Sequence, residues 1–160
     1  MSDNTTRREA LSKIEHYCSY QERCHQEVTD KLYALGVQKE DIESIIVHLI
    51  TNNYLNEERF ARSFARGKHR IKHWGKNRIV NELKLRNISA PNIKLALSEI
   101  DLDDYYECFQ NLSDRHWNTI TEKNILKKRK KFCDYLLRKG WEIDLVYEKV
   151  KELESSPSSD

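Results

Sequence analysis

The sequence contains little of the material that turns and membrane spans require. Glycine and proline together account for six of 160 residues, which argues against a turn-rich β architecture. No apolar run approaches the ~20 residues needed to cross a bilayer, so we expect no membrane partner. Residues 1–8 are polar and lack the apolar segment of a secretory signal, so we expect a cytoplasmic protein.

The sequence also lacks the short motifs that carry much of enzyme chemistry. It has no phosphate-binding glycine loop, no serine or cysteine nucleophile elbow and no His-Glu-x-x-His pair. We therefore expect a protein that is not an enzyme and that needs no cofactor.

Four cysteines are present, and reduced thiols are the default in a chain without an export signal. Two of them belong to a close group of potential metal donors, His16, Cys18, Cys24 and His25, whose spacing matches no standard zinc pattern. Packing of the two thiols beside a helix–helix turn explains this group best, and we expect no metal. A metal- or redox-dependent switch is the remaining interpretation.

A leucine followed four residues later by a helix-stopping residue occurs three times in the chain. The pairs are Leu32 with Gly36, Leu83 with Asn87, and Leu136 with Gly140. Glycine and asparagine share the last position because both tolerate the left-handed backbone conformation that ends a helix. An apolar residue follows each stop directly, and others recur six and ten positions later. A period near fifty residues predicts a linear array of small helical repeats.

The spacing of apolar residues predicts an all-α fold of three tandem three-helix repeats. We expect the repeats over 9–55, 56–100 and 101–154, with a flexible N-terminus over 1–8 and a disordered tail over 155–160. Thr6 and Asn56 are expected to cap the helices that follow them. We expect Ile71 to lie on the buried side of the helix that Asn56 begins.

The net charge of +2 conceals a strong segregation along the chain. Residues 59–86 contain ten lysines or arginines and one acid, and residues 123–139 contain eight and one. Acids outnumber bases 24 to 10 in the remainder. Charge arranged in blocks indicates a polyanionic or acidic partner that contacts one part of the surface.

The basic segments supply the candidate binding residues. Arginines at 3,4,4 spacing line one stripe of a helix, and long cationic side chains suit contacts to phosphates or acidic protein loops. We expect partner or DNA contacts from Arg62, Arg66, Arg70, Lys72, Lys76 and Arg78, and then from Lys127, Lys128 and Lys131. Trp74 lies within the first run, where packing at the inter-helix turn is a better explanation than an exposed anchor for a partner.

Three segments of the chain, 54–61, 74–79 and 82–88, resemble segments of the RecX family of recombinase regulators. Tyr54–Ala61 is similar to the family's leucine-aspartate-acid-x-Arg-Phe-Ala segment, although Asn56 replaces the aspartate. The segment 74–79 is similar to its tryptophan- and glycine-containing turn. The segment 82–88 is similar to its Glu-Leu-x-x-Lys-Gly-Ile element, with Asn87 in place of the glycine. The outer repeats resemble the family by pattern alone.

This resemblance implies three tandem three-helix repeats in an elongated, curved array. It also implies a regulator that binds the RecA recombinase and its filament on DNA. Such a regulator modulates, and mainly inhibits, ATP hydrolysis and strand exchange in recombination and DNA repair. Direct contacts to the DNA backbone and a monomeric state are further expectations. The alternative is a helical DNA-binding module of another pathway, because three-helix units can place a helix in a DNA groove.

Overall fold

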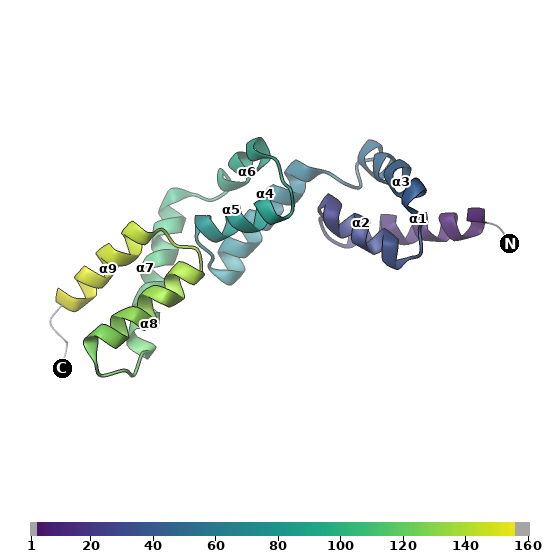
Figure 1. Ribbon diagram of the computed structural model, residues 1–160. Coiled ribbons are helices and arrows are strands. Elements are labelled where there is room, and N and C mark those ends of the chain that lie inside the picture. The colour runs from purple at the N-terminus through teal and green to yellow at the C-terminus, as the bar shows by residue number, and fades with distance from the viewer. Residues whose placement is uncertain (1–2, 156–160) are drawn as a thin grey trace. The chain divides into compact units, whose positions relative to one another are not determined.

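The computed structural model describes residues 3–155, and every regular element within them is a helix (Figure 1). The expected all-α fold is therefore confirmed. The helices are α1 (Asp3–Tyr20), α2 (His25–Ala34), α3 (Lys39–Thr51), α4 (Glu57–Lys72), α5 (Lys76–Leu85), α6 (Ala90–Leu97), α7 (Leu102–Thr119), α8 (Ile125–Arg138) and α9 (Ile143–Ser155). None of them is long and apolar enough to cross a membrane.

The three predicted helix stops share one backbone geometry. Gly36, Asn87 and Gly140 have φ angles of 84°, 59° and 98°, all in the left-handed region. In each case the amide of the following residue donates to the carbonyl of the leucine five positions earlier, at 3.1 Å. The amide of the stop residue donates to the carbonyl three positions earlier, at 3.0 Å. This double bond pattern is the Schellman motif, which satisfies carbonyls that a helix end otherwise leaves unpaired.

The predicted helix starts are confirmed at one position and wrong at another. Asn56 caps α4, because its Oδ1 accepts a hydrogen bond from the Arg59 amide at 2.8 Å. Thr6 does not cap a helix, because α1 begins at Asp3 and Thr6 lies inside it. Residues 3–8 of the expected flexible N-terminus are therefore helical, and the remainder of that segment lies outside the described residues. So does 156–160 of the expected tail.

The buried side of α4 differs from the expected one. Ile71 is 74% exposed, whereas Ala61, Ala65 and His69 are buried. These three residues recur at intervals of four, so they share one helix face that excludes position 71. His69 is tolerated there because its Nδ1 lies 3.2 Å from the Trp74 carbonyl oxygen, which gives the buried ring a polar partner.

Tertiary contacts divide the chain into two compact units. The first unit comprises the residues up to Ser63 together with Leu83–Ala96, and the second comprises Phe64–Glu82 together with the residues from Leu97 onward. The boundaries between these units fall within α4, within α5 and at the end of α6. The division into three repeats at 55/56 and 100/101 stays a prediction.

The first unit has an aliphatic core. Helix α2 packs against both α1 and α3. Ile14 of α1, Leu32 of α2, and Ile45 and Leu49 of α3 are almost completely buried among these helices. Leu32 is the leucine of the first stop motif, so the residue that the helix end positions also anchors the core.

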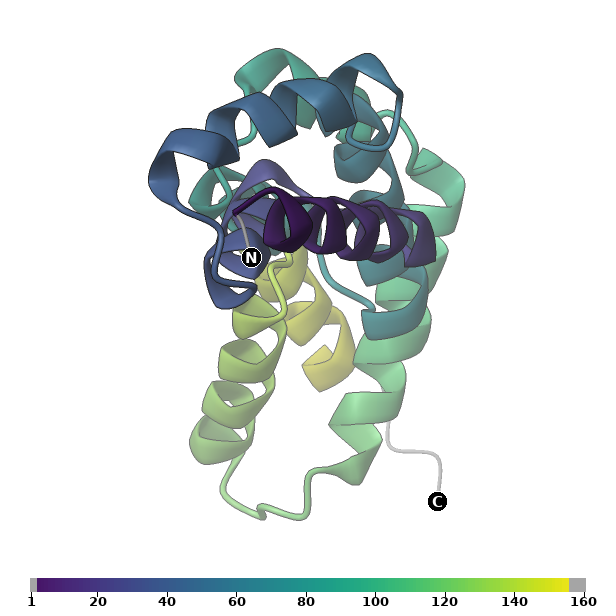
Figure 2. The same ribbon diagram turned by 90° about the vertical axis from the view of Figure 1, so that its right-hand side faces the viewer.

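The second unit has an aromatic core. Helix α8 packs against α7 and α9. Figure 2 shows the loop over residues 120–124 that joins α7 to α8. Trp141, which directly follows the third stop, lies at the centre of this core. Its ring centroid is 4.7 Å from that of Tyr105 and 5.2 Å from that of Phe109. Tilted aromatic contacts of this kind add to the large apolar area that each ring buries.

Candidate partner-binding surface

Two of the arginines on α4 are held by neighbouring acids. Arg62 lies 3.8 Å from Glu58 in the first unit, and Arg66 lies 3.3 Å from Glu99 in the second. Each of these arginine side chains is about one-third exposed. Such partly exposed pairs contribute roughly 0–1 kcal/mol, so either arginine can exchange its acid for a partner's acid at little cost.

Arg59, the first cation of the same stripe, has a structural role. Its Nε lies 2.6 Å from the Glu22 carboxylate, and its two terminal nitrogens donate to oxygens of Asn53 and Tyr54. These bonds tie the start of α4 to the segments that precede it in the first unit. The Arg59 guanidinium therefore stabilises the fold of the first unit, and we do not count it among the candidate binding residues.

The turn between α4 and α5 carries a cation–π cluster. The Arg78 guanidinium carbon lies 4.1 Å from the centroid of the Trp74 ring, and the Lys68 ammonium lies 5.1 Å from it. Phe64 meets the same indole edge-on at 6.1 Å. Trp74 is half-buried, so it acts as a platform that orients two cations. It is not an exposed anchor, in agreement with the packing interpretation.

A close approach between two backbones joins this turn to the end of α8. The Gly75 amide donates to the Lys139 carbonyl at 2.9 Å, and the Asn77 amide donates to the Gly140 carbonyl at 3.0 Å. A Cβ on Gly75 would overlap the Gly140 carbonyl, and a Cβ on Gly140 would overlap the backbone of Arg78. Only glycine at both positions allows the two turns to meet.

This contact brings together cations that are far apart in the sequence. The Lys139 Nζ donates to the Lys72 carbonyl at 2.8 Å, and the Arg78 Nη1 donates to the Arg138 carbonyl at 3.3 Å. Burial, followed by the charges of Arg78 and Lys72, lowers the pKa of the Lys139 ammonium. The two hydrogen bonds hold the three cations close to one another. We call Lys72, Arg78 and Lys139 the turn cluster.

Lys76 is anchored at the start of α5 by a buried tyrosine. The Lys76 amide donates to the Tyr105 hydroxyl at 3.0 Å, and that hydroxyl donates to a Glu142 carboxylate oxygen. The Lys76 ammonium lies 4.9 Å above the Tyr105 ring. Burial, followed by the hydrogen bond to Glu142, raises the pKa of Tyr105, so this phenol stays protonated and donates. The chain of bonds holds the first turn of α5 against α7 and α9.

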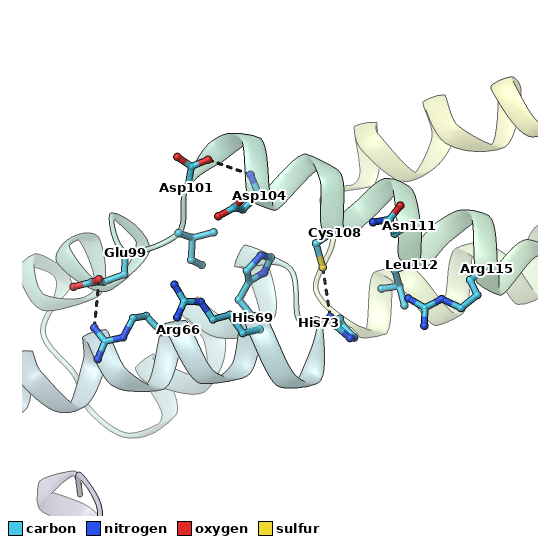
Figure 3. Close-up of a pocket in the computed structure, with 12 residues that line it drawn as sticks. Arg66, His69, His73, Glu99, Asp101, Asp104, Cys108, Asn111, Leu112 and Arg115 are labelled. Carbon is cyan, nitrogen blue, oxygen red and sulfur yellow. Dashed lines mark hydrogen bonds and ion pairs between the residues drawn. The ribbon is translucent and has the colours of Figure 1, made fainter.

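A cleft of about 320 Å³ lies beside α4 in the second unit, between α4 and α7 (Figure 3). Arg70 and Arg115 supply positive charge to its lining, and Asp101 and Asp104 supply negative charge. Arg70 is exposed. The mixture of signs suits a partner that carries both acidic and basic side chains, such as a protein surface.

A cysteine and a histidine meet inside this cleft. The Cys108 Sγ lies 3.5 Å from the His73 Nδ1, as the dashed line in Figure 3 marks. Burial raises the pKa of the Cys108 thiol, and burial together with the charges of Lys139 and Arg115 lowers the pKa of His73. Both shifts favour the neutral pair, whereas a nucleophilic cysteine needs a thiolate. The contact is therefore a packing contact.

The lysines of α8 form a separate basic surface near the start of that helix. The Lys128 ammonium lies 4.2 Å above the Trp117 ring, and Lys131 lies 3.6 Å from the Glu122 carboxylate. Lys127 is exposed, and its amide is bound by the Asn124 cap. From Lys127 to Lys139 the helical rise amounts to about 18 Å. The predicted α8 lysines therefore do not join the turn cluster.

Sequence reasoning missed Lys139, which the structure places in the turn cluster. Its position next to Gly140 was the available signal, because the matched stops showed where that backbone turns. What the sequence did not show is that Gly75 meets this turn, since the two glycines are 65 positions apart and no local pattern relates them.

The predicted group of possible metal donors does not gather into a site. Cys18 and Cys24 are buried in the first unit, whereas His16 is exposed. Burial raises the pKa of Cys18 to about 11, which disfavours the thiolate that a metal requires. Among the side chains described over residues 6–155, no three of histidine, cysteine, aspartate or glutamate are arranged to hold a metal ion.

Comparison with known proteins finds similarity to proteins named regulatory protein RecX. A family model described as RecX, second three-helix domain, matches residues 56–97. The regulatory protein RecX of Prosthecochloris aestuarii is 28% identical over 158 residues, which cover 96% of this chain and 98% of that protein. The regulatory protein RecX of Clostridium botulinum strain Eklund 17B is 30% identical over 132 residues, which cover 81% of this chain and 61% of that protein.

Solved structures show the same fold. A crystal structure of RecX from Lactobacillus salivarius superposes with a TM-score of 0.75 and 25% identity over 94% of this chain and 98% of that one. A second crystal structure of regulatory protein RecX gives a TM-score of 0.79 with 22% identity over 92% of this chain and 73% of that one. The chain spans 56% to 62% of the length of several other curated relatives.

Proposed function

We propose that this chain, which belongs to the RecX family, binds the RecA recombinase on its DNA filament and modulates its activity. The expected effect is mainly inhibition of ATP hydrolysis and of strand exchange during recombination and DNA repair. The relatives are named regulatory proteins, so the coarse role is regulation, and the identity of the partner is the part we propose.

The observation that carries the proposal is the turn cluster. The glycine-to-glycine contact holds Lys72, Arg78 and Lys139 on rigid helix ends, and Trp74 orients the Arg78 guanidinium. Pre-oriented cations lose less conformational entropy on binding than mobile ones do. Such a cluster suits acidic loops of a protein or phosphates of a DNA backbone, and a nucleoprotein filament presents both.

The mechanism we propose is steric and electrostatic. Arg70, Lys72 and Arg78 would engage acidic groups of the filament, and the weakly paired Arg66 would exchange Glu99 for an acid of the partner. Lys127, Lys128 and Lys131 would add long-range attraction through the second basic surface. A protein that bridges neighbouring RecA protomers in this way would slow the changes in the filament that accompany each round of ATP hydrolysis.

The test is RecA ATP hydrolysis on single-stranded DNA, titrated with the intact chain. We expect inhibition at well below one molecule per RecA protomer, because one bound chain would restrain several protomers. Charge reversal of Arg70→Glu with Lys72→Glu should raise the concentration needed for half-inhibition about tenfold or more. Lys151→Glu, which reverses an exposed charge on α9, is the matched control and should change little.

Direct binding to DNA distinguishes the second candidate function. A DNA-binding module of another pathway should bind duplex DNA alone, with an affinity that falls steeply with salt. A filament regulator should bind RecA-coated DNA more tightly than either bare strand. Equal affinity for bare and coated DNA, together with unchanged ATP hydrolysis, would overturn the RecA proposal.

A further inference from the structure

A second charged groove lies in the first unit, between α1 and α2. Its volume is about 580 Å³, and its lining includes Lys13, His16, Tyr17, Tyr20, Arg23 and Lys31. All of these residues come from the N-terminal part of the chain, outside both basic segments of the sequence. The groove therefore shares no residue with the turn cluster or with the α8 lysines.

The charge of this groove is opposite to that of its surroundings. Residues 1–58 contain eleven acids and six lysines or arginines. Three of those six bases, Lys13, Arg23 and Lys31, line the groove, and the residues that line it include no aspartate or glutamate. Bases concentrated in this way on an acidic segment indicate a local anion-binding function.

The two tyrosines of the groove differ in how open their rings are to a ligand. The Arg23 guanidinium carbon lies 3.6 Å from the Tyr17 ring centroid, and its Nε donates to the Tyr17 carbonyl at 3.0 Å. Glu27 holds the other end of the guanidinium at 3.9 Å. Arg23 is thus fixed flat against one phenol. The neighbouring Tyr20, at the end of α1, is 76% exposed.

We propose that this groove binds single-stranded nucleic acid. An unpaired base would stack on the exposed Tyr20 ring, and the flanking phosphates would contact Lys13 and Lys31. Sequence-independent binding of single strands commonly combines a cationic groove with aromatic rings of this kind. A duplex keeps its bases stacked on one another. Its phosphates could therefore contact the two lysines, but its bases could not stack on Tyr20. An acidic peptide could likewise use the cations, but it would leave the Tyr20 platform unused.

This site is built from other residues than the turn cluster on which the RecA proposal depends. It would let the protein hold an exposed strand directly, whether or not a recombinase is present. Failure of one proposal therefore leaves the other standing, because the binding measured here needs no RecA.

The first experiment maps the contact directly. The intact chain is irradiated with an oligodeoxythymidine of about ten nucleotides that carries 5-iodouracil, and the crosslinked peptide is identified by mass spectrometry. We expect the crosslink at Tyr20, because a stacked base places the reactive carbon against the ring. Crosslinks confined to residues 64–86 or 123–139 would overturn the assignment.

The second experiment compares matched variants by fluorescence anisotropy with the same oligonucleotide. Tyr20→Leu keeps an apolar side chain at an exposed position, and it should weaken binding about fivefold or more. Tyr33→Leu, on α2 but outside the groove lining, removes a 51% exposed tyrosine and is the control. Duplex binding should be the same for both variants.

Salt dependence and competition complete the test. Lys13→Gln and Lys31→Gln should each reduce the slope of log affinity against log salt by about 0.7, whereas the exposed Lys39→Gln should not. Equal binding by Tyr20→Leu and Tyr33→Leu would refute the stacking role. Displacement of the oligonucleotide by polyglutamate at equal charge concentration would instead identify the groove as a site for acidic peptides.

Discussion

The helix ends at Gly36 and Gly140 follow the same hydrogen-bonding pattern but occupy very different surroundings. Both residues have positive φ angles, and both are followed by a buried apolar residue. A Cβ added at Gly36 would meet nothing within 4 Å, whereas one added at Gly140 would overlap the backbone and Cβ of Arg78. One glycine serves its own helix end alone, and the other also allows two segments of the second unit to touch.

The difference shows how a repeated local motif can also bring together cations that are distant in the sequence. In the first unit the stop motif ends α2 and positions Val37 against the core. In the second unit the same motif also presents Lys139 beside Lys72 and Arg78, because Gly75 can approach Gly140 closely. The turn cluster therefore depends on a contact that the repeat pattern does not require.

The substitution Gly140→Ala should have the largest effect, because it adds a Cβ at the helix end that touches another segment. We expect a loss of about 2–4 kcal/mol in the free energy of unfolding, from the left-handed conformation together with overpacking against Arg78. Urea unfolding measures this loss. Hydrogen exchange at the Gly75 and Asn77 amides should also accelerate, because both donate to the segment that would be displaced. A loss no larger than that of the same change at Gly36 would contradict the close approach.

Gly36→Ala isolates the conformational part of the effect. We expect a smaller loss of about 1 kcal/mol, because the alanine strains only the backbone and the unfolded chain loses some freedom in compensation. Amides of the turn cluster should exchange as in the unchanged protein. If inhibition of RecA depends on the turn cluster, Gly36→Ala should retain it and Gly140→Ala should lose it.

Acidification should lower the stability of the second unit more than that of the first. Burial, followed by nearby positive charges, lowers the pKa of His73, and burial lowers the pKa of His116. Below the ordinary histidine value of about 6.5 the unfolded chain therefore binds more protons than the folded one. Stability should be full above that pH and should decrease as the pH falls from 7.5 to 5.5, by less than either glycine change causes.

Hydrogen exchange at the two pH values, corrected for intrinsic rates, measures this effect. Amides near Gly140 should lose protection, whereas those near Gly36 should not. His116→Gln is the matched variant and should flatten the decrease. A rise in stability over the same interval would show that the imidazoles gain protons on folding, which is the opposite of the expected sign.

Local patterns explain why much of the fold was predictable. Asn56 caps α4 through an atom three residues from its partner, and each stop motif closes through bonds that span no more than five residues. The errors came where the tertiary environment decided the outcome. Ile71 was expected to be buried because it is apolar, but the small side chains of Ala61 and Ala65 define the packed face of α4, and His69 continues it.

Buried polar groups were unpredictable for the same reason. Lys149 is almost completely buried, although a lysine in the middle of a helix is ordinarily expected in solvent. Its ammonium lies 2.7 Å from Asp114 and also donates to Gln110. These two partners belong to α7, more than thirty positions earlier in the sequence, so no pattern within α9 predicts them. The exposure and pairing of the predicted binding residues could not be predicted either. Arg66 is paired with Glu99, whereas Arg70 is exposed, although both lie on the same stripe of α4.

The sequence by itself determined the helices, their three matched ends and the sign of the charge in each segment. Those properties depend on residue type and on neighbours a few positions away. Only the tertiary structure decided that Gly75 meets Gly140, that Lys139 joins Lys72 and Arg78, and that three scattered bases line one groove of an acidic segment. Contacts of this kind arise from the packing of distant segments, in which the excluded volume of a single Cβ determines whether two backbones can touch.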